Sequence, residues 1–357
     1  MKRQYIIPIF VPHLGCPNEC TFCNQRKISG EQRNVTEEDV KKTIEYYLSS
    51  FKDKNSKVEV AFFGGSFTGI DVELQEKLLG AAYEFIKAKK VDSIRISTRP
   101  DYIDKKILKR LKKYKVKTIE LGVQSTNNYI LDKCKRGHTF DDVKRASKLI
   151  RWNRFTLGHQ MMVGLPDSTQ LDELNTAKDL AKLKPKMVRI YPVLVIKGTE
   201  LEKEYLAGIY EPLTLEQSVE RCKELCYFFG KKKINVIRIG LQNTDTICEP
   251  GTKNSEVVAG PYHETFRQLV ESSIYYDTIV NQIKKFNTKV KEVEIKVNPQ
   301  NVSNVVGYKK QNILKLKETY DVDVIIKQDE KCPIEKIDVQ VTKKYQDFID
   351  EKETVKK

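Results

Sequence analysis

Short apolar runs alternate along the chain with longer segments in which apolar residues recur at helical spacing. The short, β-rich runs predict strands at 5–11, 58–63, 93–97, 118–123, 156–163 and 187–191. The longer segments predict helices at 37–50, 72–87, 105–114, 140–152 and 170–183. Strand and helix therefore alternate, which indicates an α/β fold with a parallel sheet or a partial (β/α)6 barrel.

Several predicted helices begin at residues that cap a helix well. Thr36 is followed three positions later by Asp39, and Thr139 by Asp142, which is the spacing of a capping box. Asp104 is an N-cap candidate for the helix that follows it. In barrels of this kind, chemistry gathers at the C-terminal ends of the strands. The residues that follow each strand are therefore the candidates for a functional site.

The regular pattern predicts a core domain at 1–242 and then changes. Residues 243–289 begin with turn formers and are expected to form an extension that packs on the barrel. Residues 290–330 predict a separate small α/β unit with strands at 293–297 and 322–327 and helices at 302–306 and 311–320. Residues 331–357 are expected to form a charged C-terminal tail with a frayed end.

The net charge of +15, from 64 Lys and Arg against 49 Asp and Glu, favours a polyanionic partner, with RNA as the natural candidate. Residues 281–357 hold 17 Lys and 13 acids, so most of the excess lies on the core domain. A solvated lysine-rich surface without such a partner is the alternative.

The chain has no run of about 18 apolar residues, so no membrane span is expected. Pro8, Pro12 and His13 interrupt the apolar N-terminus, which argues against a secretory signal and for a cytoplasmic protein.

Three of the eight cysteines lie close together in a loop after the first strand. Cys16, Cys20 and Cys23 form a CxxxCxxC motif, a pattern suited to metal ligation in a reducing compartment. Three thiolates on one loop can ligate three irons of a [4Fe–4S] cluster and leave one iron open. The open iron can chelate S-adenosylmethionine, and one electron then breaks the C5′–S bond to give a 5′-deoxyadenosyl radical. A zinc site completed by His13 is the alternative, although zinc more often uses paired CxxC motifs and Phe22 favours the cluster.

The cysteine motif is followed by five further segments that carry a family resemblance. They are FFGGSFT at 62–68, LGVQS at 121–125, KRGHT at 135–139, HQMMVGLP at 159–166 and IYPVLVIKGT at 190–199. With them, the chain resembles the radical S-adenosylmethionine (radical SAM) superfamily, and within it the radical SAM half of Elongator's catalytic subunit (Elp3). The likeness covers roughly residues 5–238. It implies a partial TIM-like barrel that binds S-adenosylmethionine beside the cluster.

The resemblance implies roles for the residues at the strand ends. Gly64, Gly65 and Ser66 would meet the methionyl amino group, because glycines let backbone carbonyls approach an ammonium closely. Ser97 would lie near the cofactor, and Arg136 would pair with the methionyl carboxylate.

Later strand ends complete the implied site. Gln124 and Ser125 would hydrogen-bond the ribose. The segment formed by Gly164, Leu165 and Pro166 would border the adenine. Tyr191 and Lys197 lie where the last strand opens toward the substrate, and they are the candidate catalytic residues.

The chain departs from the family after about residue 244. Residues 244–357 do not resemble the acetyltransferase domain of Elongator's catalytic subunit, so no use of acetyl-CoA is expected. The small unit at 290–330 resembles a KH-type RNA-binding module, whose GxxG loop clamps a nucleotide backbone. Here the loop starts at Gly307, and Lys310 replaces its second glycine, which leaves Lys309 and Lys310 as candidates for RNA binding. A docking or dimerisation element is the alternative.

These features predict a radical SAM enzyme that modifies RNA, most simply tRNA, with electrons from a donor such as ferredoxin or flavodoxin. One alternative is radical chemistry on a small molecule, as in the anaerobic coproporphyrinogen dehydrogenases. Another is a non-catalytic RNA-binding iron–sulfur protein.

Three further cysteines, Cys222, Cys226 and Cys248, are candidates for an auxiliary cluster, although buried inert cysteines are the commoner case.

Overall fold

A computed structural model describes residues 4–11, 20–24, 35–53, 56–286, 289–334 and 336–345. The chain divides into two compact units, Met1–Glu264 and Thr265–Lys357. This boundary runs through the segment 243–289 that was expected to pack on the barrel as one extension. Helix α10 (Phe266–Ile283) shares its buried core with the small sheet of the second unit, so it belongs to that unit.

The centre of the first unit is a curled sheet in which the described residues form seven parallel strands. Their order is β1-β2-β3-β4-β5-β6-β8, and each neighbouring pair is parallel. The predicted partial barrel is confirmed, and β8 adds a strand that the apolar pattern did not predict. The strands are Gln4–Val11 (β1), Lys57–Gly64 (β2), Ser93–Thr98 (β3), Val116–Gln124 (β4), Thr156–Val163 (β5), Met187–Pro192 (β6) and Asn235–Ile239 (β8).

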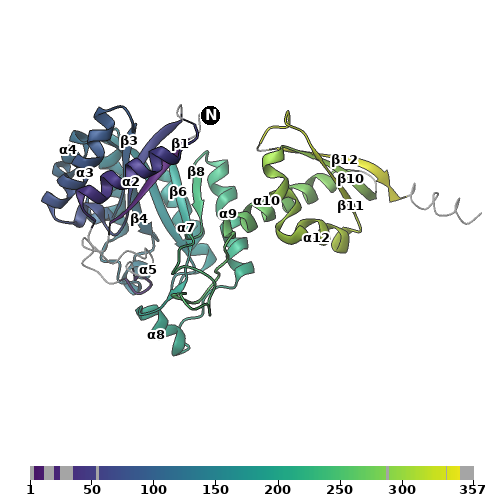
Figure 1. The fold of residues 1–357 in the computed structure, drawn as a ribbon. Coiled ribbons are helices and arrows are strands. Elements are labelled where there is room, and N and C mark those ends of the chain that lie inside the picture. The colour runs from purple at the N-terminus through teal and green to yellow at the C-terminus, as the bar shows by residue number, and fades with distance from the viewer. Residues whose placement is uncertain are drawn as a thin grey trace, which may run out of the picture. The chain divides into compact units, whose positions relative to one another are not determined.

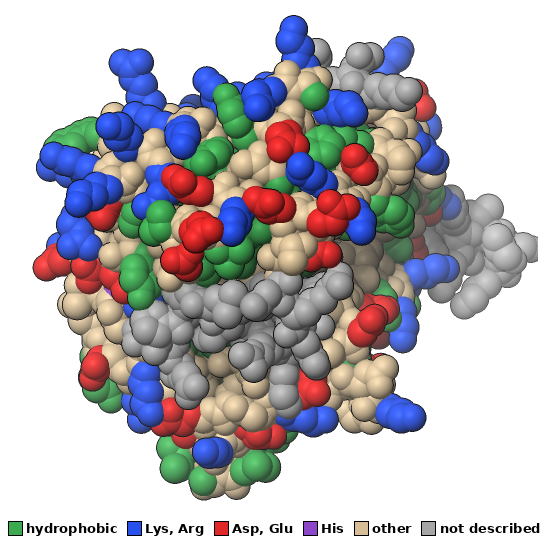
Figure 2. Space-filling view, turned by 60° about the vertical axis from the view of Figure 1, so that its left-hand side comes forward, with side chains coloured by type: hydrophobic (Ala, Val, Ile, Leu, Met, Phe, Trp, Pro, Cys, Tyr) green, Lys and Arg blue, Asp and Glu red, His purple; other side chains and the backbone are tan. Residues whose placement is uncertain are grey.

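Helices connect consecutive strands and cover the outer face of the sheet, as Figure 1 shows for α2, α3 and α4. Their outer surfaces are strongly charged, as the side brought forward in Figure 2 illustrates. The predicted caps are present, since Thr36 and Thr139 form capping boxes and Asp104 accepts from the Ile107 amide. The helices are Glu37–Ser50 (α2), Val72–Lys87 (α3), Lys105–Lys113 (α4), Asn128–Lys133 (α5), Phe140–Trp152 (α6), Gln170–Lys182 (α7), Glu200–Leu206 (α8) and Leu215–Lys231 (α9). Among the described residues, no helix is long and apolar enough to cross a membrane.

The strands present different chemistry on their two faces, because successive side chains alternate across a strand. The face under the helices is apolar: Ile94, Ile96 and Ile119, for example, are fully buried there. The inner face carries charged side chains instead, including Glu59 and Arg95, which are also buried. The inner surface of the barrel is therefore a polar layer held inside an apolar shell.

After β6, the chain adds a second, two-stranded sheet to the first unit. Its strands are Val195–Ile196 (β7) and Val257–Ala259 (β9), which pair antiparallel. Leu194 and Ile196 pack with Ile247 and Val257 in one buried cluster. This cluster fixes the segment after β6 beside the loop that follows β8.

The second unit contains a three-stranded sheet of order β11-β10-β12 in the described residues. Strand β10 (Val290–Val297) pairs parallel with β11 (Asp323–Gln328) and antiparallel with β12 (Ile337–Lys344). The expectation of a charged tail at 331–357 was therefore wrong for 337–344. The alternation Ile-Asp-Val-Gln-Val in that segment puts its apolar residues on the core side of the sheet.

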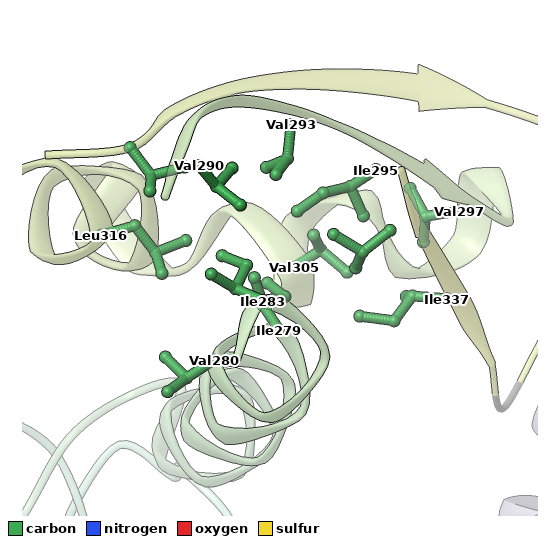
Figure 3. Close-up of a cluster of buried hydrophobic side chains, with 12 residues drawn as sticks. Ile279, Val280, Ile283, Val290, Val293, Ile295, Val297, Val305, Leu316 and Ile337 are labelled. Atoms are coloured by element: carbon green, nitrogen blue, oxygen red, sulfur yellow. The ribbon is translucent and has the colours of Figure 1, made fainter. Parts of the chain in front are cut away.

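One hydrophobic core joins this sheet to its helices, α10, α11 (Val302–Val306) and α12 (Gln311–Tyr320). Figure 3 shows Ile279 and Ile283 of α10 pointing toward the side chains of β10, with Leu316 of α12 beside them. Burying an aliphatic side chain of this size contributes about 1.5–3 kcal/mol. Helix α10 is thus an integral part of the second unit.

Candidate active site

A cavity opens in the first unit where the parallel strands end. The segment after β1, the ends of β2 to β6 and the loops that follow β6 and β8 all contribute to its wall. The lining residues are Cys20, Phe22, Cys23, Gly64, Gly65, Ser66, Ser97, Thr98, Arg99, Gly122, Gln124, Arg136, Gln160, Met162, Tyr191, Pro192, Leu194, Ile196 and Leu241. Eight of the predicted cofactor and catalytic positions are in this set, together with two of the predicted cysteine ligands.

The cysteine segment is held by backbone hydrogen bonds to two other parts of the fold. The Thr21 amide donates to the carbonyl of Cys134 at 3.2 Å, and its carbonyl accepts from the Leu201 amide at 2.8 Å. Arg136 Nη1 lies 3.1 Å from Cys20 Sγ, so a cation adjoins this buried sulfur. Cys16 lies outside the described residues.

The glycine-rich end of β2 follows a steric requirement. Gly64 has a φ of +111°, and a Cβ there would lie 2.3 Å from the carbonyl oxygen of Val11 on the neighbouring strand. The Gly65 amide donates to the same oxygen at 3.3 Å. Ser66 Oγ then lies 2.8 Å from Thr98 Oγ1 and accepts from the Arg99 amide at 3.2 Å. These hydrogen bonds join the ends of β1, β2 and β3 into one rigid part of the cavity wall.

Gln124 stands at the end of β4 with a φ of +71°, in the left-handed region that non-glycine residues rarely adopt. It lines the cavity, and its Oε1 atom is buried with no hydrogen-bond partner in the described part of the chain. Native proteins satisfy nearly all buried acceptors. The amide oxygen of Gln124 is therefore available to a donor group of a molecule in the cavity.

The floor of the cavity is a buried network of four charges from four strands. Glu120 is 1% exposed and accepts from Arg95 Nη1 at 2.6 Å and from Arg189 Nη2 at 3.1 Å. Arg95 also pairs with Glu59 at 2.7 Å. Two acids and two arginines balance, so the network holds no net charge.

The network reaches the cavity wall through two neutral side chains. Gln160 Nε2 donates to Glu120 Oε2 and to Ser97 Oγ, each at 3.2 Å. Arg189 Nη1 lies 3.5 Å from the hydroxyl of Tyr191. Burial raises the pKa of Tyr191 against the opposing effect of Arg189, so its phenol is protonated at neutral pH. Both side chains are therefore oriented from below, with polar groups available to a molecule above them.

The structure does not bring every predicted residue into the cavity. Ser125 turns away, because its hydroxyl accepts from the Asn127 amide at 3.1 Å at the start of α5. Lys197 is exposed, and its Nζ donates to the carbonyl of Ser255 at 2.7 Å.

Gly164, Leu165 and Pro166 line a second pocket together with Tyr210, whose hydroxyl donates to the Gly164 carbonyl at 2.7 Å. Leu165 nevertheless packs in the same hydrophobic cluster as Cys20. The segment therefore supports the cysteine loop from behind rather than forming the wall of the main cavity.

His138 and His159 are both buried. Burial, helped by the nearby cations Arg136 and Arg99, lowers the pKa of His138 to about 4. Burial also lowers the pKa of His159 to about 3, and its Nε2 lies 2.9 Å from Ser147 Oγ under the helices. Both imidazoles are neutral at pH 7, and His159 is on the apolar outer face of the sheet.

The candidate auxiliary cysteines do not form a metal site in the structure. Cys222 is fully buried in α9, and Cys248 Sγ lies 3.3 Å from Thr252 Oγ1 in a separate loop. Across the described ranges, no group of three or more His, Cys, Asp or Glu residues could hold a metal ion. Burial raises the pKa of the Cys222 thiol, which keeps it protonated.

Sequence reasoning missed Gln160 and Met162 of the wall and the charged floor beneath them. The sequence does carry a sign of this buried network: Arg95, Glu120 and Arg189 each lie between apolar residues within a predicted strand. A charged residue inside a strand of a covered sheet needs a partner. Such residues on neighbouring strands therefore indicate a buried network.

Comparison with known proteins agrees with this geometry. Residues 10–180 match the radical SAM superfamily, and residues 185–276 match the radical SAM C-terminal domain. The tRNA uridine(34) acetyltransferase of Methanocaldococcus jannaschii is 32% identical over 185 residues, which are 46% of this chain and 34% of that protein. An uncharacterized protein of the same organism is 30% identical over 231 residues, which are 61% of this chain and 70% of that protein.

Among solved structures, the archaeal Elp3 of Methanocaldococcus infernus is similar in fold, with a TM-score of 0.60 at 22% identity. The match covers 79% of this chain and 64% of that one. The chain thus spans about a third of the length of the acetyltransferase relative and matches it only in part. With the curled parallel sheet, the cysteine segment and both family matches in agreement, the chain belongs to the radical SAM superfamily of enzymes.

Proposed function

We propose that this enzyme binds a [4Fe–4S] cluster through Cys16, Cys20 and Cys23 and S-adenosylmethionine in the cavity beside it, and that it modifies RNA, most simply tRNA. The observation that carries the proposal is the meeting of Cys20, Cys23 and the strand-end residues in one cavity. When bound, the cluster supplies an electron that cleaves the sulfonium of the cofactor. A donor such as ferredoxin or flavodoxin would provide that electron.

The residues present fit such a cofactor. Arg136 Nη1 lies beside Cys20 Sγ, and Gly64 and Gly65 at the end of β2 line the cavity, where their backbone can approach an ammonium group closely. The buried Oε1 of Gln124 offers an acceptor to a ribose hydroxyl. The buried network beneath Gln160 and Tyr191 carries no net charge and holds both side chains in place.

Two features favour RNA over a small molecule as the substrate. The net charge of +15 suits a polyanion, and a relative named as a tRNA uridine(34) acetyltransferase matches 46% of this chain. Because that match covers only 34% of the relative, the group that this enzyme transfers does not follow from it.

The second unit supports the same proposal. Helices α11 and α12 flank the turn from Gly307 to Lys310, as in a KH-type loop. Lys309 and Lys310 both adopt left-handed conformations there, with φ of 49° and 64°, so Lys310 takes the backbone geometry that glycine would favour. We infer that the unit is KH-like and that these lysines contact RNA phosphates.

Cofactor cleavage tests the chemistry. The anaerobically reconstituted protein, given dithionite and S-adenosylmethionine, should release 5′-deoxyadenosine detectable by mass spectrometry. Cys20→Ala should abolish the product, whereas Cys248→Ala, a cysteine outside the cavity, should not. An intact cluster without product would leave an iron–sulfur protein that is not an enzyme of this class.

RNA modification needs its own test. Nucleosides from the tRNA of a strain that lacks the gene should miss one modification found in the parent strain, and the wild-type gene should restore it. A Cys20→Ala gene should fail to restore it. An unchanged nucleoside profile would refute tRNA as the substrate.

A further inference from the structure

Lysines and arginines gather at the edge of the first unit that lies opposite the cavity. In a parallel sheet with covering helices, the helices end where the strands begin, so helix C-termini and strand N-termini share one edge. Five connections at this edge carry three cations in 87–90, four in 112–117, two in 151–154, three in 182–186 and three in 231–233. All of these cations are exposed, and the five segments contain no acid. We name these segments the basic rim.

Contacts between neighbouring connections make the basic rim continuous. Each connection lies beside the next one around the barrel, and where the contact is not made by the connection itself it is made by a residue of the adjoining helix or strand. The contacts are the Tyr83 and Tyr114 rings at 6.1 Å, Lys112 Nζ to Asn153 Oδ1 at 3.1 Å, Arg151 Nη1 to the Leu183 carbonyl at 3.4 Å, and the Asn235 amide to the Lys186 carbonyl at 3.3 Å. In Figure 2, Lys and Arg side chains crowd the upper left of the view with few acidic side chains among them.

The charge of the basic rim exceeds what its helix ends require. Cations are favourable at helix C-termini, but each end carries only about −0.5 of a charge, or about −2.5 for five helices. Fifteen cations face this edge. In the described part of the chain, Lys182 is the one rim residue with an ion pair, to Asp179 at 2.8 Å. Most of the positive charge is therefore left for a partner.

An aromatic side chain accompanies this charge. Trp152, the single tryptophan of the chain, is 69% exposed within the basic rim. Lys148 Nζ lies 4.4 Å from the centre of its ring, so a cation already occupies a position over the indole. Exposed aromatic faces between cations are the feature with which proteins stack unpaired bases.

We propose that the basic rim binds the phosphate backbone of the RNA substrate, with Trp152 stacking on a base; this rests on the RNA substrate proposed above. Five consecutive connections suit a long polyanion better than a small anion. An acidic electron-donor protein fits less well, because the length of a strand such as β5, about 25 Å, would separate it from the cysteine segment. A folded RNA is long enough to contact the basic rim and still reach the cavity.

The test is the salt dependence of binding to bulk tRNA by the reconstituted protein, followed through Trp152 fluorescence. The rim variant combines Lys90→Gln, Lys113→Gln and Lys186→Gln. The magnitude of its slope of log affinity against log salt concentration should be lower than that of wild type by about 2–3, because each lost phosphate contact lowers this slope by about 0.7–0.9. The control variant replaces Lys42, Lys77 and Lys144, exposed lysines that each pair with an acid. It removes the same charge and should leave the slope unchanged.

The outcomes separate this proposal from the function on which it rests. Equal affinity and slope for the rim variant and wild type would overturn the basic rim as the site while leaving RNA as the substrate. No tRNA binding by wild type, or rim-dependent binding of polyglutamate or phosphatidylserine vesicles instead, would overturn both. The rim variant should release 5′-deoxyadenosine at the wild-type rate without RNA, since the rim residues do not line the cavity.

Discussion

Replacing Glu120 with glutamine tests the role of the buried charge network beneath the cavity. The substitution keeps the size of the side chain but removes one of two negative charges that face two buried arginines. The network then carries an uncompensated positive charge. Gln160 loses its direct hydrogen bond to the Glu120 carboxylate, and Tyr191 is affected through Arg189, which contacts both Glu120 and the Tyr191 hydroxyl.

The expected loss is large because the carboxylate is 1% exposed and accepts bonds from both arginines. Removing one partner of a buried ion pair typically costs about 3–5 kcal/mol of unfolding free energy. The matched control is Glu84→Gln, which breaks the exposed 2.8 Å pair with Lys41. An exposed pair of this kind contributes about 0–1 kcal/mol.

The effect should also depend on pH in a defined direction. Burial acts to raise the pKa of Glu120, but Arg189 and Arg95 outweigh it and hold the pKa below its ordinary value of 4.5. The charge therefore contributes its full stability above pH 4.5, and that contribution is lost as the pH falls through the lower pKa of the folded state. The difference between wild type and Glu120→Gln should accordingly shrink below pH 4.5.

Urea unfolding of wild type, Glu120→Gln and Glu84→Gln, at pH 7 and at pH 4, measures these differences. A loss of less than about 1 kcal/mol for Glu120→Gln at pH 7, equal to that of the control, would refute the network as a stabilising element. A loss that grows at pH 4 would refute the assigned direction of the pKa.

Three further predictions concern the cavity wall. Gly64→Ala should destabilise the protein by about 2 kcal/mol or more in the same unfolding assay, because its Cβ would lie 2.3 Å from the Val11 oxygen. Arg136→Lys should weaken iron retention against a chelator by about 10–100-fold, because a lysine cannot reproduce the guanidinium contact with Cys20; unchanged iron content would contradict this. Gln124→Ala should raise the dissociation constant of S-adenosylmethionine by about 2–10-fold with no loss of iron, as expected for one hydrogen bond, and unchanged binding in calorimetry would exclude that contact.

The strand and helix pattern of the first unit followed from the sequence because its apolar residues serve one purpose, packing between the sheet and its helices. Strand β12 was missed because only one face of it is buried, and the polar residues Asp338, Gln340, Thr342 and Lys344 occupy the other face. Strand β8 is short and partly exposed, so its apolar signal is weak. The spacing of apolar residues predicts a strand only where its side chains are buried, and β8 and β12 are only partly buried.

The cavity could be predicted where a strand end carries an unusual residue type, as at Gly64 and Gln124. It could not be predicted where the direction of a side chain decides. Ser125 is adjacent to Gln124 in sequence, yet its hydroxyl accepts from the Asn127 amide before α5, and Lys197 donates to a carbonyl in a loop 58 residues away. Such contacts depend on how distant segments meet, which the local sequence does not specify.

The central claim is that three thiolates hold a cluster with one iron left open to S-adenosylmethionine. Metal analysis combined with electron paramagnetic resonance of the reduced, anaerobically reconstituted protein tests it most directly. The account predicts about four irons and four sulfides per chain and a spectrum that changes when S-adenosylmethionine is added. Zinc bound at Cys20 and Cys23, or a cluster spectrum that the cofactor leaves unchanged, would contradict it.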